Sequence, residues 1–241
     1  MTTKIIVNGA RGRMGQEAVR TIRASKGFEL VAELGREDDL AASIQQTQAD
    51  VVVDLTTASA AYDNAVTIIE NHARPVIGTS GLLPNDVQDL RERCQAQSLG
   101  GIVAPNFSIG AALMMRFSEQ AAKYFNYAEI IELHHERKKD APSGTGIATA
   151  ELIGSVRANH SHECTTLLEG ALGATHKTVP LHSVRMPGLL AHQEVIFGDH
   201  GGTLKIRHDS MSREDFMPGL LMCCQKVLTL DHLVYGLEKL L

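Results

Sequence analysis

The sequence predicts an α/β protein with a Rossmann-like parallel-sheet domain and a smaller α+β domain that contains a mixed or antiparallel sheet. Short apolar runs alternate with helical spacing through about residue 106, which is typical of a parallel sheet covered on both faces. A glycine-rich turn joins the first run to the first helical segment. Beyond residue 107 this alternation gives way to extended segments separated by glycine turns, which indicates a second domain.

Five apolar runs are expected to form the parallel sheet, because each is short and contains β-branched residues. Between them, apolar side chains recur at helical spacing, as in Tyr62, Ala65 and Ile69. The expected strands are Lys4–Asn8, Phe28–Leu34, Asp50–Leu55, Pro75–Gly78 and Gly101–Ala104.

The turn after the first strand has the pattern G-x-x-G-x-x-G and is followed by a helix. Glycines permit a tight turn and a close approach of the backbone, and the helix N-terminus favours an anion, so this turn suits the pyrophosphate of a dinucleotide. Glycine turns are also frequent in any α/β protein. The expected cofactor-binding residues here are Gly9, Ala10, Arg11, Gly12, Arg13 and Met14.

Turns that follow the carboxyl ends of parallel strands line the ligand crevice of such sheets. Two further turns occupy these positions, and their residue types are equally typical of plain structural turns; Ser108, for example, suits a helix N-cap. The candidate cofactor-binding residues in them are Gly78, Thr79, Ser80, Ala104, Pro105, Asn106 and Phe107.

The second half of the chain is expected to begin with a helix over Ile109–Phe125, followed by a strand over 128–133. Residues 155–175 are weakly patterned and are interpreted as a connecting region in which His160 and His162 have no catalytic role. Three alternating segments are predicted to be strands, and a last helix begins near Ser212. These strands are Pro180–Arg185, Gln193–Phe197 and Thr203–Arg207.

The richest chemistry lies between Glu129 and Gly146, where a strand, a loop and a helix start follow one another. His134, His135 and Lys138 offer movable protons and positive charge, and the Ser143–Gly146 turn offers free helix amides, which together suit an acidic small molecule. A solvated charged turn is the alternative interpretation. A metal site is not expected, because adjacent strand residues point to opposite faces and no third ligand lies at chelating spacing.

This stretch resembles the signature of the dihydrodipicolinate reductase family, E-x-x-E-x-H-H-x-x-K-x-D-x-P-S-G-T. The residues that match it are Glu129, Glu132, His134, His135, Lys138, Asp140, Pro142, Ser143, Gly144 and Thr145. The glycine loop, the two later turns and the segment from His192 to Ser210 extend the resemblance over nearly the whole chain.

The resemblance implies NAD(P)H-dependent reduction of 4-hydroxy-tetrahydrodipicolinate in diaminopimelate and lysine biosynthesis. It assigns acid chemistry to His134 and Lys138, and it assigns a substrate carboxylate to His135, Ser143, Gly144 and Thr145. It also implies a homotetramer assembled through the second sheet. The expected domains are 1–106 for the dinucleotide and 107–213 for substrate binding and oligomerisation, with 214–241 returning to the first.

Two other functions stay open from the residues alone. One is another two-domain Rossmann oxidoreductase of the amino-acid dehydrogenase type, and the other is a non-catalytic regulator that senses a dinucleotide. Loss of the proton donors Lys138, His134 and His135 would favour the regulator, and all three are present.

Composition excludes other classes of protein. The formal net charge of −5 argues against a nucleic-acid partner, and no apolar run is long enough to span a bilayer, so neither nucleic acid nor membrane is expected. The absence of an apolar leader predicts a cytoplasmic protein. The four cysteines show no metal or C-x-x-C spacing and are expected to be reduced.

The end of the second strand predicts which cofactor is preferred. An acidic side chain there usually accepts hydrogen bonds from the ribose of NADH and repels the phosphate of NADPH. Here that position falls on Gly35, with Arg36 beside it. Both cofactors are therefore expected to bind, with NADPH favoured through Arg36 and an arginine of the glycine loop. The alternative is that Glu33 takes the acidic role after a small shift in register.

Overall fold

The computed structural model describes residues 2–157 and 164–241, so His160 and His162 lie outside it. The described chain divides into two compact units. The first contains Met1–Ile109 and Arg213–Leu241, and the second contains Gly110–Ser212. None of the described helices is long and apolar enough to cross a membrane.

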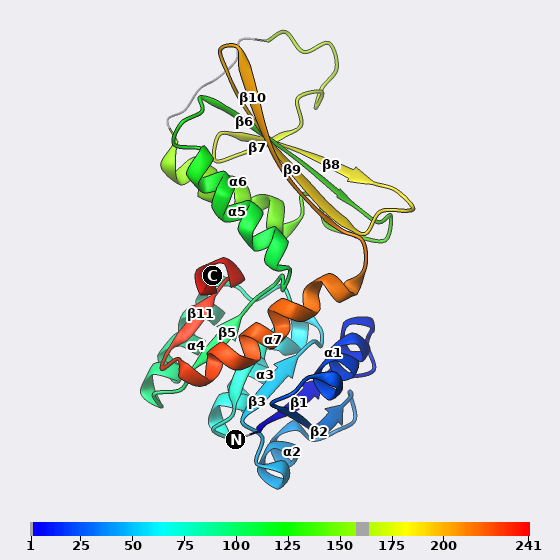
Figure 1. Ribbon diagram of the computed structural model, residues 1–241, viewed down its shortest axis with the longest axis vertical. Helices are drawn as coiled ribbons and strands as arrows, with labels where there is room; N and C mark the ends of the chain where they lie inside the picture. The colour runs from blue at the N-terminus through cyan, green and yellow to red at the C-terminus, as the bar shows by residue number, and fades with distance from the viewer. Residues whose placement is uncertain (1, 158–163) are drawn as a thin grey trace. The chain divides into compact units, whose positions relative to one another are not determined.

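The first unit is built on a parallel sheet of six strands in the order β11-β5-β4-β3-β1-β2 (Figure 1). β1 and β3 are almost wholly buried, as expected for central strands of a parallel sheet. The order changes direction between β1 and β3, which is where ligands bind in open α/β sheets. The strands are β1 (Thr3–Asn8), β2 (Phe28–Leu34), β3 (Val51–Asp54), β4 (Arg74–Ile77), β5 (Gly101–Val103) and β11 (Leu233–Tyr235).

Helices cover this sheet. α1 (Arg13–Ala24) buries Ala18, Val19 and Ile22 on one stripe and contacts α7 (Met217–Lys226). α2 (Leu40–Thr47), α3 (Ala58–Glu70) and α4 (Pro84–Ala96) contact one another in sequence and share a core cluster with strand residues such as Ile6. Short 3₁₀ helices at Arg213–Phe216, Val227–Thr229 and Leu237–Leu240 complete the C-terminal segment.

The second unit contains a mixed sheet of five strands in the order β10-β9-β6-β8-β7, in which only β6 and β8 are parallel. Its strands are β6 (Tyr127–His134), β7 (Ala174–His176), β8 (Val179–Arg185), β9 (Ala191–Asp199) and β10 (Gly202–Ser210). Both the parallel sheet and this mixed sheet confirm the predicted fold class.

Helices α5 (Ile109–Ala121) and α6 (Gly144–Val156) lie on one face of the mixed sheet (Figure 1). The core between them contains Ile130, Ile153, Leu181 and Phe197, which are all buried. Side chains alternate along a strand, so Glu132 points to the same face as Ile130.

The opposite face of the mixed sheet has a different character. Half-buried apolar residues such as Ile131 and Leu133 lie there beside a row of ion pairs. Glu194 on β9 pairs with Lys205 at 3.1 Å and with Arg207 at 3.2 Å on β10. In the part of the chain that the structure describes, no helix covers this face.

The structure differs from the predicted elements at several places. The last helix, predicted to begin near Ser212, begins at Met217 after a 3₁₀ helix over Arg213–Phe216. The helix from Ile109 ends at Ala121 rather than Phe125. β7 at Ala174–His176 was interpreted as part of the connecting region, and β11 at Leu233–Tyr235 was not predicted. Both strands have three residues, too few to show alternation, and each is defined by its pairing with another strand, β7 with β8 and β11 with β5.

Candidate functional site

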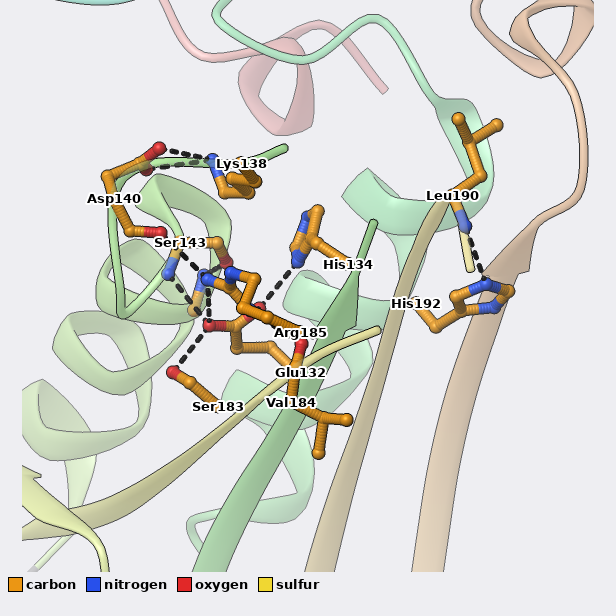
Figure 2. Close-up of polar contacts among 11 residues, drawn as sticks. Glu132, His134, Lys138, Asp140, Ser143, Ser183, Val184, Arg185, Leu190 and His192 are labelled. Atoms are coloured by element: carbon orange, nitrogen blue, oxygen red, sulfur yellow. Dashed lines mark hydrogen bonds and ion pairs between the residues drawn. The ribbon is translucent and has the colours of Figure 1, made fainter. Parts of the chain in front are cut away.

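A fully buried carboxylate, Glu132, lies at the centre of the candidate site in the second unit (Figure 2). Its Oε1 accepts hydrogen bonds from the Ser183 hydroxyl at 2.5 Å, the Arg185 Nη2 at 2.8 Å and the Ser143 amide at 3.1 Å. Its Oε2 is 2.5 Å from the His134 Nδ1 and accepts from the Arg185 Nη1 at 2.9 Å. Five contacts from four residues therefore satisfy this one carboxylate.

These contacts decide the charge of Glu132. Burial raises the pKa of the carboxyl, but hydrogen bonds from His134, Arg185 and Ser183 outweigh burial and hold the pKa at about 2, below its ordinary value of 4.5. The carboxylate is therefore ionised at neutral pH. Further hydrogen bonds satisfy both oxygens of Glu132, whereas the buried Arg185 Nε has no hydrogen-bond partner among the described residues.

His134 is the last residue of β6, and its side chain is 15% exposed. Because an ionised carboxylate can only accept, the contact with Glu132 requires a proton on the His134 Nδ1. In the neutral ring the Nε2 is then the acceptor. This arrangement suits a group that takes up or delivers a proton at the Nε2.

Lys138 lies in the loop after β6, and its ammonium is held by both oxygens of Asp140 at 2.9 and 2.7 Å. Burial raises the pKa of Asp140, but the hydrogen bond from Lys138 brings it below the ordinary value. Arg185 links this loop to the buried carboxylate, because its Nη2 also donates to the Asp140 carbonyl at 2.8 Å. Figure 2 shows Lys138 and His134 on the same side of Glu132.

The start of α6 presents the predicted anion site. Ser143 is the N-cap, and its buried hydroxyl accepts from the Gly146 amide at 3.1 Å, so this hydroxyl holds the helix start. A side chain at Gly144 would meet nothing within 4 Å, which leaves the backbone there open to a ligand. Thr145 follows in the first turn and is half-buried. His135 is half-buried directly after β6.

Among residues 2–157 and 164–241, no group of three His, Cys, Asp or Glu side chains is arranged to hold a metal ion.

The glycine turn of the first unit has the geometry that a dinucleotide requires. Gly9 has φ +84°, and a Cβ there would lie 2.6 Å from the Leu55 carbonyl oxygen, so no other residue fits. A Cβ on Gly15 would lie 2.1 Å from the Gly9 oxygen. Because glycine has no Cβ, the first turn of the helix can pack directly against the glycine turn. Gly12 is the N-cap of α1 and no side chain caps this helix, so its first amides face outward.

A second buried carboxylate, Asp54, lies at the end of β3 beside this turn. Its Oδ2 accepts from the Asn8 and Asn64 amides at 2.9 and 2.7 Å, and its Oδ1 accepts from the Thr56 and Thr79 hydroxyls at 2.8 and 3.2 Å. Burial raises the pKa of Asp54 above its ordinary value of 3.8, and the hydrogen bonds offset this only in part. Asp54 thus joins the turns that follow β1, β3 and β4.

The other predicted cofactor residues lie near these turns. A Cβ on Gly78 would lie 2.4 Å from the Phe107 ring. That ring is buried, so Phe107 packs directly against the turn at Gly78. Ala104 is buried, and its amide donates a hydrogen bond to the Ile77 carbonyl oxygen. Pro105 and Ser80 are exposed. The Asn106 side chain accepts from the Ser108 amide at 2.9 Å.

The turn after β2 contains an acidic residue, Asp38, that was not among the candidates for the ribose. Asp38 accepts from the Gly35 amide at 2.7 Å and lies 3.7 Å from the Arg11 guanidinium. Glu33 instead pairs with Arg23 of α1, and Arg36 is exposed. Arg11 and Asp38 thus lie together where the adenosine ribose binds in sheets of this kind.

Sequence reasoning also missed Arg185 and Ser183. It placed Arg185 only as the last residue of a strand, because nothing local shows that β8 pairs with β6 and brings both residues against Glu132. The one available signal was Glu132 itself, a charged residue on a strand face that is otherwise buried.

Comparison with known proteins covers both units. The family model for the dihydrodipicolinate reductase N-terminus matches residues 3–107, and the model for its C-terminus matches residues 110–241.

Similar whole proteins agree. A 4-hydroxy-tetrahydrodipicolinate reductase from Legionella pneumophila (strain Philadelphia 1) and one from Coxiella burnetii (strain Dugway 5J108-111) are each 51% identical, over all of this chain and all of theirs. A dipicolinate-bound dihydrodipicolinate reductase from Paenisporosarcina sp. TG-14 has a TM-score of 0.91 and 41% identity, with complete coverage of both chains.

Proposed function

This chain belongs to the dihydrodipicolinate reductase family, and we propose that it reduces 4-hydroxy-tetrahydrodipicolinate to tetrahydrodipicolinate with a reduced nicotinamide dinucleotide. The reaction consumes one hydride and one proton and releases the ring hydroxyl as water. It belongs to diaminopimelate and lysine biosynthesis. The observation that supports it best is the cluster of Glu132, His134 and Lys138 beside the open start of α6, since it offers both proton donors and an anion site.

The residues of the first unit fit the dinucleotide. Gly9 and Gly15 leave no room for side chains at the turn, and the uncapped start of α1 offers amides to a pyrophosphate. We assign cofactor binding to this turn and to the turns around Thr79 and Asn106. When bound, the nicotinamide supplies the hydride.

In the second unit, Lys138 and His134 perform the acid chemistry. Hydride addition to the unsaturated ring leaves negative charge on atoms conjugated with the ring nitrogen, and an ammonium both stabilises and protonates such a position. Asp140 holds the Lys138 ammonium in place. His134 offers the Nε2 because its Nδ1 faces Glu132.

The two substrate carboxylates bind to positive and donor groups. We assign one of them to His135 and to the amides and hydroxyl of Gly144 and Thr145, because a helix N-terminus with an open glycine favours an anion. Ser143 contributes through its position at the cap rather than through its hydroxyl, which Gly146 occupies. The relative with bound dipicolinate supports a site for a planar cyclic dicarboxylate.

NADPH is proposed as the favoured cofactor, with NADH also used. β2 ends at Leu34, so Gly35 and Arg36 take the position of the usual acidic residue, and the Glu33 carboxylate is engaged by Arg23. Arg11 and Arg36 are cations within the segments that adjoin a 2′-phosphate. Asp38, the acidic side chain beside Arg11, is the group that would favour NADH instead.

The protein is also proposed to be a homotetramer in the cytoplasm. The helix-free face of the mixed sheet combines half-buried apolar residues with ion pairs, and a symmetric copy would bury it. Light scattering at micromolar concentration tests the assembly, since a monomer there contradicts it.

One assay tests the reaction. The preceding synthase supplies the cyclic substrate, and NADPH absorbance is followed with this protein present or absent. Substrate-dependent oxidation that pyridine-2,6-dicarboxylate inhibits competitively supports both the reaction and the carboxylate site. Oxidation with an amino acid or its keto acid, but not with the cyclic substrate, would favour an amino-acid dehydrogenase. Cofactor binding without any turnover would favour a regulator.

A further inference from the structure

We propose that Glu132 is a positioning residue that fixes the proton of His134 on Nδ1, holds the start of α6 through the Ser143 amide and ties the Lys138 loop to the same point through Arg185. The inference rests on the proposed function for its effect on turnover. Its geometric part concerns only contacts within the second unit.

Glu132 is surrounded by hydrogen-bond donors. Glu132 Oε1 faces three donors, namely the Ser183 hydroxyl, the Ser143 amide and the Arg185 Nη2. Oε2 faces the other guanidinium nitrogen and the imidazole. An ionised carboxylate can only accept hydrogen bonds, so the imidazole must donate to it, as the other neighbours do. The proton of the neutral imidazole therefore lies on Nδ1.

The same carboxylate also holds the start of α6 and the Lys138 loop. The Ser143 amide belongs to the N-cap of α6, so Glu132 sets where the open helix start lies. Arg185 spans from Glu132 to the Asp140 carbonyl, and the Asp140 side chain in turn holds the Lys138 ammonium. Both proton donors and the anion site therefore share one anchor.

Burying the Glu132–Arg185 ion pair costs free energy of hydration. A fully buried ionised carboxylate and a guanidinium that is 18% exposed lose hydration that an apolar pair would not lose. For stability alone, a pair of apolar side chains would serve as well. The retained charge has a use if an ionised acceptor is needed to orient a neighbouring imidazole, as carboxylates do beside histidine bases in other enzymes.

The decisive variant is Glu132→Gln. The amide oxygen is expected to take the Oε1 position, because three donors meet there. Its NH₂ group then faces His134 and donates to Nδ1, which moves the ring proton to Nε2. The variant is expected to lower kcat by about 10²–10⁴-fold. The KM for the dinucleotide should be unchanged, because that cofactor binds to the first unit.

The readout for the tautomer is ¹⁵N NMR of histidine-labelled protein, with the His134 signals assigned by comparison with His134→Asn. The wild type is expected to carry a proton on Nδ1, and Glu132→Gln is expected to lose it. Glu132→Asp keeps an ionised acceptor, so it should retain the Nδ1 proton and recover part of kcat. A structural role alone would not move the proton between ring nitrogens.

Glu151→Gln is the matched control. It removes the carboxylate from another Glu–His pair, Glu151 with His176 at 3.2 Å, on the exposed side of α6. Both kcat and the His134 signals should stay as in the wild type.

Two results would overturn the proposal. One is a wild-type His134 without a proton on Nδ1, which needs no variant and so decides the matter even if Glu132→Gln fails to fold. The other is a folded Glu132→Gln protein with wild-type kcat. If the wild type does not reduce the cyclic substrate at all, the proposed function fails, whereas the NMR reading still decides whether Glu132 fixes the tautomer.

Discussion

Among residues 2–157 and 164–241, each unit has one fully buried carboxylate, and the two are satisfied in opposite ways. Asp54 in the first unit is surrounded by neutral amides and hydroxyls, whereas Glu132 in the second unit is bonded to a guanidinium and an imidazole. Burial raises the pKa of both carboxyls. The hydrogen bonds around Glu132, from His134, Arg185 and Ser183, outweigh burial, whereas those around Asp54 do not.

The difference separates two tasks. Neutral donors around Asp54 join the turns that follow β1, β3 and β4 and leave the pKa of its carboxyl raised. The guanidinium and the imidazole around Glu132 favour its ionised form, beside the groups that we propose move protons. The following variants test whether the two carboxylates divide scaffold and chemistry in this way.

The largest effect is expected from Lys138→Ala in the second unit. Loss of a positioned acid lowers kcat by about 10²–10⁴-fold, while the dinucleotide still binds to the first unit. The matched variant Thr79→Val removes one donor to Asp54 and should raise the KM for the dinucleotide while leaving kcat within a few-fold. Steady-state kinetics with both substrates varied separates the two, and equal effects on kcat would break the division.

Acid unfolding should show opposite signs for the two carboxylates. The pKa of Glu132 is lowered from 4.5 to about 2, so its contribution to the free energy of unfolding is present above pH 4.5. Roughly 3 kcal/mol of it is lost as the pH falls from 4.5 to 2. The pKa of Asp54 is raised from 3.8, so its contribution is fully present below pH 3.8 and is lost as the pH rises through the raised value.

Urea titrations of the wild type, Glu132→Gln and Asp54→Asn at several pH values measure these contributions. The stability advantage of the wild type over Glu132→Gln should shrink on acidification below pH 4.5. Its advantage over Asp54→Asn should instead grow. If the free energy of unfolding relative to the wild type changes with pH in the same way for both variants, the different donors around Glu132 and Asp54 do not shift their pKa values in opposite directions.

At neutral pH, Asp54→Asn should destabilise the first unit by about 1–2 kcal/mol. Where the new NH₂ group faces the Asn8 and Asn64 amides, which both donate to the carboxylate, a contact is lost unless an amide turns over. Where it faces the Thr56 and Thr79 hydroxyls, these can turn and accept, but the Thr56 backbone amide loses its acceptor. kcat should change little, since Asp54 takes no part in proton transfer. A lower urea midpoint with near wild-type kcat is the expected result, and a kcat loss as large as that of Lys138→Ala would contradict it.

The smallest effect is expected from the exposed Arg36. Arg36→Ala should lower the preference for NADPH over NADH by about five- to tenfold, with NADH use largely intact. Arg20→Ala, which removes another exposed arginine paired with Glu17, is the control. If the wild type uses NADH with equal or better kcat/KM, Asp38 or Glu33 governs the ribose instead.

The comparison also shows what the sequence could reveal. Asp54 and Thr79 lie at the ends of apolar strands that the residue pattern identifies, so their meeting follows from the rule that such ends share one edge. Ser183 and Arg185 meet Glu132 only through the pairing of β6 with β8, about 50 residues away, and no local pattern fixes that register. The motif around His134 predicted candidate reacting groups, which stay a prediction, but it did not predict that Ser183 and Arg185 contact Glu132.

The placement of β11 has a consequence for how the chain acquires its structure during synthesis. β5 is completed at Val103, but its outer neighbour begins only at Leu233, after the whole second unit. Until then the nascent chain presents the open edge of β5, and α7 is also missing from the first sheet. Such an edge invites pairing with other chains, so chaperones that shield nascent proteins should matter more to this protein than its small size suggests.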